Sequence, residues 1–386
     1  MNIVINTIPL LSPLTGVGNC IYHTARELLD TDTKNDYTFY YGCFSDRLVC
    51  PTLPADEAPG PGISFLHRAR RFLEGHPPVR AVVRRSAETW HRAAARSRRF
   101  DLYYEPNYVP LGIRTRSLVV TVHDLSFIHH PEWHPKDRVE YFRKHFLTRI
   151  GRADMIATDS EFTRRELLKL VKTDSSRIRT VPLGYDRRVF RPRDREDVER
   201  FRRAHELPEK FLLSVGPIEP RKNIDRLLHA YARLPRHLRA ECKLVLTGSA
   251  GWRSEATMRR TSAMAGEVGF LGYLSTDDLA LAYNAATAFV FPSLYEGFGL
   301  PVLEAFGCGC PVVASHIEAL RETCADAACF VDPTDAAAIA EGIHNILTDN
   351  ELRRSLARKG RKRAAGFGWD KTARRLLQIF EEVSSK

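Results

Sequence analysis

The chain has 386 residues, of which 44% are hydrophobic, and its formal net charge at pH 7 is +11. This length exceeds that of one compact domain and predicts two domains of ordinary size. Eight cysteines in so long a chain do not make a disulfide framework, and the lack of any run of about 18 apolar residues argues against a membrane-spanning helix. These totals favour a globular protein of the reducing cytoplasm.

The first half of the chain alternates short apolar runs with helical patterns. The N-terminus lacks a basic region before its apolar residues, so we expect a first strand at 3–5 and not a signal peptide. A loop at 15–18 then precedes a helix over 19–29, whose apolar residues share one face. Further strands are expected at 37–41, 102–104, 118–122 and 155–157. Ser160 suits the N-cap of the next helix, and the alternation indicates a doubly wound α/β domain.

A strongly basic segment lies between residues 66 and 100, where ten arginines face only two glutamates. The arginines are Arg68, Arg70, Arg71, Arg80, Arg84, Arg85, Arg92, Arg96, Arg98 and Arg99. Apolar side chains such as Phe72 and Trp90 alternate with them. A surface of this kind attracts anionic lipid headgroups, phosphates or nucleic acid. A solvated helix face in an arginine-rich protein is an equally good interpretation.

The second half begins after a stretch, 185–209, that is dense in charge and poor in apolar residues. This composition predicts a surface segment between two domains. A second α/β series follows, with helices capped by Asn223 and Ser275 and a final helix over 370–383. Its expected strands are 211–215, 244–246, 268–271, 289–291 and 311–314. We therefore predict an α/β protein of two Rossmann-like doubly wound domains facing across a cleft, where ligands bind at the carboxyl ends of strands.

The most informative motif is Phe-Pro-Ser-Leu-Tyr-Glu-Gly-Phe-Gly-Leu-Pro-Val-Leu-Glu at 291–304. An apolar strand leads into a glycine turn, which brings Glu296 to the carboxyl end of that strand. Glu304 is expected about one turn into the next helix. The N–H groups of Gly299 and Leu300 would face an anion at the helix start. A phosphate with a polyhydroxyl group on either side fits this arrangement.

A second motif, Ser-Val-Gly-Pro-Ile-Glu-Pro-Arg-Lys-Asn at 214–223, follows a strand and opens a helix. Gly216 lets the backbone turn at the strand end. Arg221 and Lys222 come just before the helix, where fixed cations can neutralise a diphosphate leaving group. Taken alone, an Arg-Lys pair before a helix is also typical of a solvated loop.

The first half contributes a histidine and a glycine pair. His123 follows the buried strand 118–122, so it faces the predicted cleft, and Asp124 is a candidate to orient its ring. A histidine that merely caps the strand is the alternative. Gly16 and Gly18 allow close approach of the backbone to a ligand, although a lone Gly-x-Gly is a weak motif.

Together these motifs resemble those of the retaining glycosyltransferases of family 4, over nearly the whole chain. The pair Glu296 and Glu304 resembles the family's Glu-x7-Glu motif, and the 214–223 stretch resembles its phosphate-binding lysine motif. Pro217 stands where many members carry arginine, and Arg221 is the candidate to supply that charge. The resemblance implies a GT-B architecture with domains at 1–186 and 210–369, an inter-domain segment at 187–209, and a helix at about 370–386 that packs back on the first domain.

The resemblance also implies roles for particular residues. The candidate catalytic residues are His123, Glu296, Lys222 and Arg221. Glu296 would hold hydroxyls of the donor sugar and Glu304 those of the ribose. The donor-binding set is Gly16, Gly18, Gly216, Arg221, Lys222, Phe270, Leu271, Glu296, Gly297, Phe298, Gly299, Leu300 and Glu304. No cofactor besides the nucleotide-sugar donor is implied. No metal is expected either, because the cationic pair replaces it and the Asp-x-Asp at Asp30 and Asp32 ends a helix.

The resemblance is greatest to bacterial mannosyltransferases of polysaccharide and lipopolysaccharide synthesis, which makes GDP-mannose the expected donor. A glycan or lipid-linked acceptor is expected, with segment 66–100 attaching the protein to the anionic inner face of the cell membrane. No carboxylate stands out as a nucleophile, so the departing phosphate is expected to take the acceptor's proton. A sugar-nucleotide epimerase of the same fold and a non-catalytic binding protein for nucleic acid or another anion are the alternatives. Nucleic acid is not expected, since no base-stacking motif is present.

Overall fold

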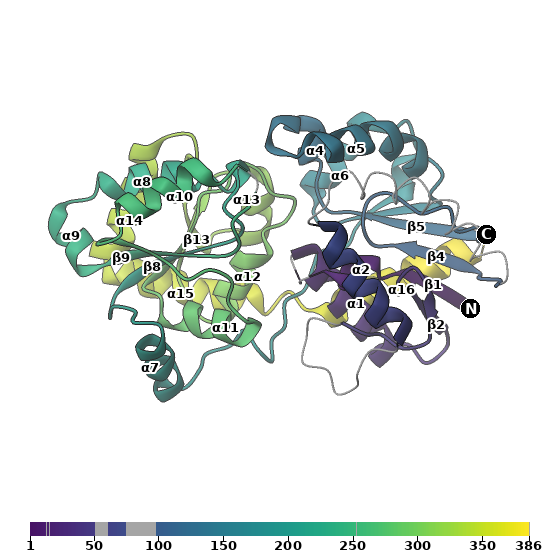
Figure 1. The fold of residues 1–386 in the computed structure, drawn as a ribbon, viewed down its shortest axis with the longest axis horizontal. Coiled ribbons are helices and arrows are strands. Elements are labelled where there is room, and N and C mark those ends of the chain that lie inside the picture. The colour runs from purple at the N-terminus through teal and green to yellow at the C-terminus, as the bar shows by residue number, and fades with distance from the viewer. Residues whose placement is uncertain (13, 15, 51–60, 75–97, 252, 386) are drawn as a thin grey trace. The chain divides into compact units, whose positions relative to one another are not determined.

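The computed structural model describes residues 1–12, 14, 16–50, 61–74, 98–251 and 253–385. The chain divides into two compact units. The first unit comprises Met1–Leu125, Glu140–Gly184 and Trp369–Lys386, and the second comprises Ser126–Val139 and Tyr185–Gly368. Figure 1 shows the course of the chain through both, and each unit is described by itself. Among the described residues, no helix has both the length and the apolar character needed to cross a bilayer.

The first unit is built on a seven-stranded sheet of order β3-β2-β1-β4-β5-β6-β7. All neighbouring strands are parallel except β2 and β3. The strands are β1 (Asn2–Asn6), β2 (Asp36–Tyr40), β3 (Phe44–Ser45), β4 (Leu102–Glu105), β5 (Ser117–Val122), β6 (Met155–Thr158) and β7 (Ile178–Thr180). Four strands predicted from their apolar runs (2–6, 36–40, 117–122 and 155–158) are mostly buried, as parallel strands covered by helices must be.

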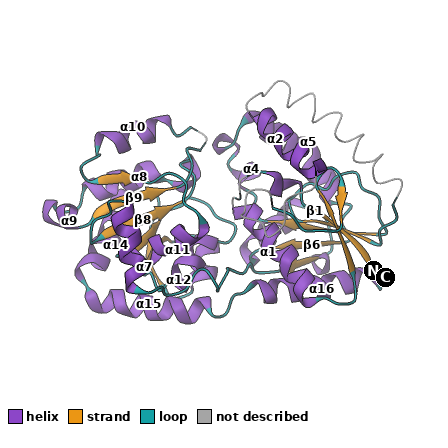
Figure 2. Ribbon diagram, turned by 60° about the horizontal axis from the view of Figure 1, so that its bottom comes forward, coloured by secondary structure: helices purple, strands orange, loops and turns teal. Residues whose placement is uncertain are grey.

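Helices cover both faces of this sheet, as the ribbon coloured by secondary structure shows (Figure 2). They are α1 (Gly16–Thr31), α2 (Pro61–Glu74), most of α5 (Lys136–Ile150), α6 (Glu161–Leu170) and α16 (Trp369–Ser384). The C-terminal helix α16 lies against α1 and places Phe380 on Tyr104 of β4, with ring centroids 5.3 Å apart. Residues of the C-terminal helix thereby complete the hydrophobic core of the first unit.

Two local predictions for the first unit have different outcomes. Ser160 is the N-cap of α6, since its side chain accepts a hydrogen bond from the Thr163 N–H. The loop predicted at 15–18 is wrong, because α1 already begins at Gly16 and contains Gly18. Gly18 is tolerated there because its missing side chain leaves room for Leu14, which would lie 3.0 Å from an added Cβ.

The second unit is built on a six-stranded parallel sheet of order β10-β9-β8-β11-β12-β13. The strands are β8 (Phe211–Val215), β9 (Lys243–Thr247), β10 (Val268–Phe270), β11 (Ala288–Phe291), β12 (Val312–Ser315) and β13 (Ala328–Val331). The strand order runs in one direction from β8 to β10 and in the other from β11 to β13. The reversal between β8 and β11 is a topological switch point, where such sheets bind ligands.

The helices of the second unit alternate with its strands. They are α4 (Ser126–His129), α7 (Arg195–Ala204), α8 (Ile224–Ala232), α9 (Arg236–Glu241), α10 (Glu255–Ala263), α11 (Thr276–Ala285), α12 (Leu300–Gly307), α13 (Glu318–Cys324), α14 (Ala336–Thr348) and α15 (Asn350–Ala364). Ser275 caps α11 by accepting from the Asp278 N–H, as predicted. The predicted inter-domain segment 187–209 instead contains α7, which packs on α11 and belongs to the second unit. Its single buried side chain, Phe201, explains why the sequence looked like a linker.

The loops at the carboxyl edge of the second sheet are tied to one another by backbone hydrogen bonds. The Gly216 N–H donates to the Thr247 carbonyl after β9, and the Gly248 N–H donates to the Gly272 carbonyl after β10. The Leu294 N–H, after β11, donates to the Arg221 carbonyl. The four strand-end loops therefore form one connected rim on which side chains are held in fixed positions.

Candidate functional site

The centre of the rim is a buried ion cluster around Glu296. This residue lies in the loop between β11 and α12 and is 7% exposed. Its Oε1 is 2.6 Å from Nζ of Lys222, and its Oε2 is 2.8 Å from Nη1 of Arg221. One carboxylate therefore accepts from both cations of the 214–223 motif, so the structure brings together three of the four residues predicted to be catalytic.

Two further side chains complete the cluster. Glu219 Oε1 accepts from Nε and Nη2 of Arg221 at 3.1 and 3.0 Å. Nζ of Lys222 lies over the ring of Phe291, 4.7 Å from its centroid, in a cation–π contact. Two carboxylates and two cations balance formally, and this balance lets four ionisable groups share a largely buried place.

The electrostatics of Glu296 follow from these contacts. Burial by itself would raise the pKa of this carboxyl, but the charges of Arg221 and Lys222 outweigh burial and hold the pKa below its usual value. Glu296 is therefore an anion at neutral pH. An incoming ligand that brings negative charge to Arg221 and Lys222 competes directly with this carboxylate.

The backbone between Gly216 and α8 explains how Lys222 reaches this place. Residues Pro220–Lys222 form a short 3-10 turn, and Asn223 follows in the left-handed region at φ 59°. The prediction that Asn223 caps α8 with its side chain is wrong. Its Nδ2 instead donates to the carbonyl oxygens of Pro292 and Pro333 at 2.9 and 2.8 Å, which fixes the ends of β11 and β13 to this turn.

Gly216 is required beside Lys222 for a steric reason. Its φ is +140°, and an added Cβ would lie 3.3 Å from Cε of Lys222. The lysine stem therefore runs across the face of this glycine on its way to Glu296. Pro217, which follows Gly216, stands where the family motif carries arginine. Arg221 binds the Glu296 carboxylate beside Lys222.

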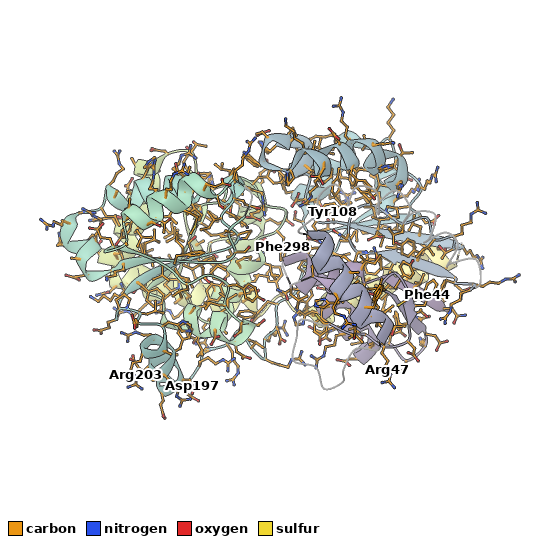
Figure 3. The ribbon with its side chains drawn as sticks, viewed as in Figure 1. Phe44, Arg47, Tyr108, Asp197, Arg203 and Phe298 are labelled. Carbon is orange, nitrogen blue, oxygen red and sulfur yellow. The ribbon has the colours of Figure 1, made fainter. Side chains whose placement is uncertain are left out.

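The glycine turn after Glu296 starts helix α12. Gly299 is its N-cap at φ +97°, a conformation that side-chain-bearing residues rarely adopt, and an added Cβ would lie 2.4 Å from Leu320. Phe298, labelled in Figure 3, is buried, and its carbonyl accepts from the Thr323 hydroxyl at 2.6 Å. Gly297 and Leu300 are buried on either side. The burial of these residues and the hydrogen bond from Thr323 thus hold the turn in place.

Glu304 lies in the second turn of α12, close to the predicted place. It is 7% exposed, and its Oε2 accepts from the Tyr283 hydroxyl at 3.3 Å. Burial raises the pKa of this carboxyl from about 4.5 to about 8, and the tyrosine only partly offsets the effect. Glu304 is therefore mostly protonated at neutral pH, in contrast to Glu296.

The two residues predicted to line a nucleobase lie at the end of β10. Phe270 is 37% exposed, and the Leu271 N–H donates to the Leu246 carbonyl. An exposed aromatic ring at a strand's carboxyl end suits stacking on a base. These residues belong to the same rim as Gly216 through the bonds that join the loops after β8, β9 and β10.

His123 belongs to the first unit, where it follows β5 at the carboxyl edge of the sheet. The prediction that Asp124 orients its ring is wrong. Nδ1 of His123 is instead 2.8 Å from Oδ2 of Asp159, which follows the neighbouring strand β6. Adjacent parallel strands end at the same edge, so a carboxylate 36 positions away in the chain contacts the ring.

No cluster of three or more histidine, cysteine or acidic side chains with metal-binding geometry occurs among the residues that the structure describes. Asp32, of the Asp-x-Asp that was set aside as a metal site, accepts from the Tyr37 hydroxyl and the Asn35 amide at 2.6 Å each. It therefore joins the end of α1 to β2.

Four side chains of the site are not among the residues predicted from the sequence: Glu219, Phe291, Asp159 and Tyr283. A signal existed for Asp159, which follows a predicted strand just as His123 does. Glu219 lies inside the 214–223 motif, of which the two cations were predicted to be site residues. Nothing in the sequence pattern identifies Phe291 or Tyr283, because Phe291 meets Lys222 across β11 and the turn before α8, and Tyr283 meets Glu304 across α11 and α12.

The raised pKa of Glu304 predicts a pH dependence of stability. The folded state holds this proton up to about pH 8, whereas the unfolded state releases it near pH 4.5. The stabilising contribution is thus complete below about pH 4.5 and is lost as the pH rises through 8. Denaturant unfolding of wild type and Glu304→Gln should show the difference between their unfolding free energies shifting in favour of the variant from pH 5 to pH 9. A difference that does not change with pH would contradict a protonated Glu304.

Comparison with known proteins places this geometry in a family. The model described as "Glycosyltransferase Family 4" matches residues 14–189, and "Glycosyl transferases group 1" matches residues 196–363. O-antigen chain mannosyltransferase B of Escherichia coli is 32% identical over 388 residues, covering 99% of this chain and all of that protein.

Solved structures share the fold of the whole chain. Sucrose-phosphate synthase from Thermosynechococcus elongatus matches with a TM-score of 0.72 at 22% identity, covering 100% of this chain and 99% of that one. HepE of Anabaena, in complex with UDP and glucose, matches with a TM-score of 0.70 at 16% identity, covering 99% of this chain and 100% of that one. Two Rossmann-like sheets in one chain form the GT-B fold, and the chain belongs to the family 4 glycosyltransferases.

Proposed function

We propose that this glycosyltransferase moves mannose from GDP-mannose to a lipid-linked or surface-polysaccharide acceptor and retains the anomeric configuration. The observation that carries the proposal is the pair of cations, Arg221 and Lys222, held on one buried carboxylate at the carboxyl edge of the second sheet. Two fixed positive charges side by side suit the two phosphates of a nucleotide-diphosphate leaving group.

Relatives support the choice of donor and product. The full-length relative from Escherichia coli is a mannosyltransferase of the O-antigen chain. Structures of HepE with UDP and with UDP-glucose give the fold a precedent for nucleotide sugars. The proposed transfer of mannose from GDP-mannose to a growing glycan takes its sugar from the mannosyltransferase relative. It takes the class of donor, a nucleotide sugar, from the HepE structures.

Each residue of the rim has a role in this proposal. Arg221 and Lys222 hold the diphosphate, and Glu296, released from them in part, accepts from hydroxyls of the donor sugar. Gly299 and Leu300 present backbone N–H groups at the start of α12. Glu304 contacts the ribose hydroxyls, and Phe270 and Leu271 contact the base. Gly16, Gly18 and His123 act from the first unit.

The chemistry follows from what surrounds the leaving group. Arg221 and Lys222 stabilise the charge that grows on the diphosphate as its bond to the sugar carbon breaks. The acceptor hydroxyl then attacks the same face of the sugar, and its proton passes to the departing phosphate oxygen. Glu219 and Glu296 balance the charges of the cations and hold them in place before the donor binds. No reorganisation of the cations is then needed at the moment of transfer.

Lys222→Ala should reduce the rate of transfer about 10²–10³-fold, because one fixed charge on the leaving group is lost. The measurement is turnover of radiolabelled GDP-mannose with a lipid-linked acceptor, and the products also report acceptor-free isomerisation, the expected outcome for an epimerase. Lys243→Ala, which removes an exposed lysine at the start of β9, is the matched control and should keep full activity. Transfer by Lys222→Ala at the wild-type rate would remove this residue from the mechanism.

The transfer is proposed to need no divalent cation, because Arg221 and Lys222 take its place on the diphosphate. Activity should therefore survive exhaustive treatment with a chelator, measured in the same assay before and after removal of the chelator. Recovery of lost activity on adding Mg²⁺ or Mn²⁺ would show that a metal shares the charge of the leaving group.

We further propose that the protein attaches to the anionic inner face of the cell membrane through segment 66–100. Most of this segment lies outside the described residues, including Arg80, Arg84, Arg85, Arg92 and Arg96. Helix α2 leads into this segment and exposes Arg68 within it and Phe65, at 64%, one turn before Arg68. Arg98 and Arg99 are exposed at the other end.

Sedimentation with vesicles tests this attachment. Vesicles that contain an anionic lipid should carry the protein down at low salt, since each basic residue near the surface contributes about 1 kcal/mol. Binding should weaken in high salt and in a Phe65→Ser, Arg68→Ser variant. Equal sedimentation with neutral and anionic vesicles would leave the segment as an ordinary solvated surface.

A further inference from the structure

A buried histidine–aspartate pair at the carboxyl edge of the first sheet has a feature that the proposed chemistry does not use. His123 is 7% exposed and Asp159 is 3% exposed. Nδ1 of the ring is 2.8 Å from Oδ2 of Asp159, and Nε2 is 2.9 Å from the carbonyl oxygen of Pro106. Both ring nitrogens therefore face oxygen atoms.

The chemistry of these two oxygens decides the protonation of the ring. A backbone carbonyl oxygen can only accept a hydrogen bond, so Nε2 must carry a proton to bind Pro106. An ionised carboxylate likewise only accepts, so Nδ1 must carry a proton as well. A neutral imidazole has one proton and would leave a nitrogen lone pair pointing at one of these oxygens. With an ionised Asp159, the geometry is satisfied only by the imidazolium.

The partners of the ring cannot easily turn away. The Pro106 carbonyl sits between Glu105 and Asn107, and the Asn107 N–H donates to Glu105 Oε1 at 3.1 Å. Asn6 donates to both oxygens of the same carboxyl at 3.0 and 2.9 Å. On the other side, Asp159 immediately precedes Ser160, the N-cap that starts α6. The bonds to Glu105 thus fix the Pro106 carbonyl, and the start of α6 fixes the backbone of Asp159.

The charged and titratable groups around the ring agree with a positive charge. Asp159 contacts it, and Asp124 adds a second negative charge from the adjacent position. Tyr108, labelled in Figure 3, places its ring edge-on at 5.5 Å, and burial raises the pKa of Tyr104, which borders the same interior. Burial works to lower the pKa of His123, yet Asp159 and Pro106 outweigh it, and the pKa is raised.

The space beside the ring admits no substrate group. The cavity that His123 and Asp159 border with Thr24, Thr121 and Thr372 has a volume of about 10 Å³. That is room for about one water molecule. The ring therefore acts through its charge and not by direct contact on this side.

We propose that Asp159 is a positioning residue that, with the Pro106 carbonyl, holds His123 as an imidazolium, a fixed positive charge at the carboxyl end of β5. If the chain transfers sugar as proposed, His123 is then no general base, because it has no free lone pair. The acceptor's proton must go elsewhere, which agrees with its transfer to the departing phosphate oxygen.

Nitrogen NMR of the histidine rings tests the proposal on the full chain without any substrate. With ¹⁵N-labelled histidine, and with His123→Gln used to assign its signals, both ring nitrogens of His123 should show protonated shifts at pH 7. Asp159→Asn keeps the size of the side chain and removes its charge, and one nitrogen should then lose its proton at pH 7. Asp124→Asn, which removes the neighbouring negative charge and keeps the Asp159 contact, is the matched control and should lower the pKa less.

An unprotonated ring nitrogen of wild-type His123 at pH 7 would overturn the proposal, whatever the variants do. So would equal shifts of the pKa in Asp159→Asn and Asp124→Asn. The role in transfer has a separate readout, the pH profile of kcat. It should fall as His123 loses its proton in the spectrum, and Asp159→Asn should move the fall to lower pH. A rate that rises with this deprotonation would make His123 a base. Absence of any transfer would count against the proposed function and leave the spectra as they are.

Discussion

Two positive charges bound to one buried carboxylate constrain the whole carboxyl edge of the second sheet. Burying Lys222 and Glu296 costs several kcal/mol per ion in desolvation, and the attraction between them offsets this cost only if the geometry is good. The chain meets the requirement with bonds of 2.6 and 2.8 Å to the two oxygens of Glu296 and with a second carboxylate on Arg221. Replacement by apolar side chains is often neutral or stabilising for such clusters. A cluster of this kind is therefore best explained by what it binds.

The remainder of the second unit keeps these groups in position. Asn223, in a left-handed conformation, joins the turn of Lys222 to the ends of β11 and β13. Gly216 leaves space for the lysine stem, and Gly299 lets α12 begin directly behind Glu296. Glu304 shares this helix, yet it meets a tyrosine and no cation. Two glutamates of one motif thus differ in protonation, because Glu296 contacts two cations and Glu304 is buried against a tyrosine hydroxyl.

The sequence was sufficient for the fold and for the ion cluster of Arg221, Lys222 and Glu296, and insufficient for the residues that contact its candidate site residues. Runs such as 118–122 identify buried parallel strands from composition alone, and the glycine turn places Glu296 and Glu304 on either side of a helix start. The short strand β7, Ile-Arg-Thr, has mixed side chains and carries no comparable pattern. Asp124 is the candidate that adjacency in the chain suggests, whereas the register of β5 and β6 brings Asp159 to the ring. Asn223 stands at the N-cap of α8, but its side chain makes no cap bond, because it is in the left-handed region and its Oδ1 accepts from Arg226.

The central claim is that the pairing of Lys222 and Glu296 is kept for donor binding and not for stability, and a double-mutant cycle measures it most directly. Unfolding free energies of wild type, Lys222→Met, Glu296→Gln and the double variant give the coupling between the two side chains, and calorimetric titration with GDP-mannose gives donor binding for each protein. The account predicts that each single change destabilises the chain, that the double variant recovers part of the loss with a coupling of about 1 kcal/mol or more, and that donor binding is weakened in all three. Additive losses of stability with donor binding intact would contradict it.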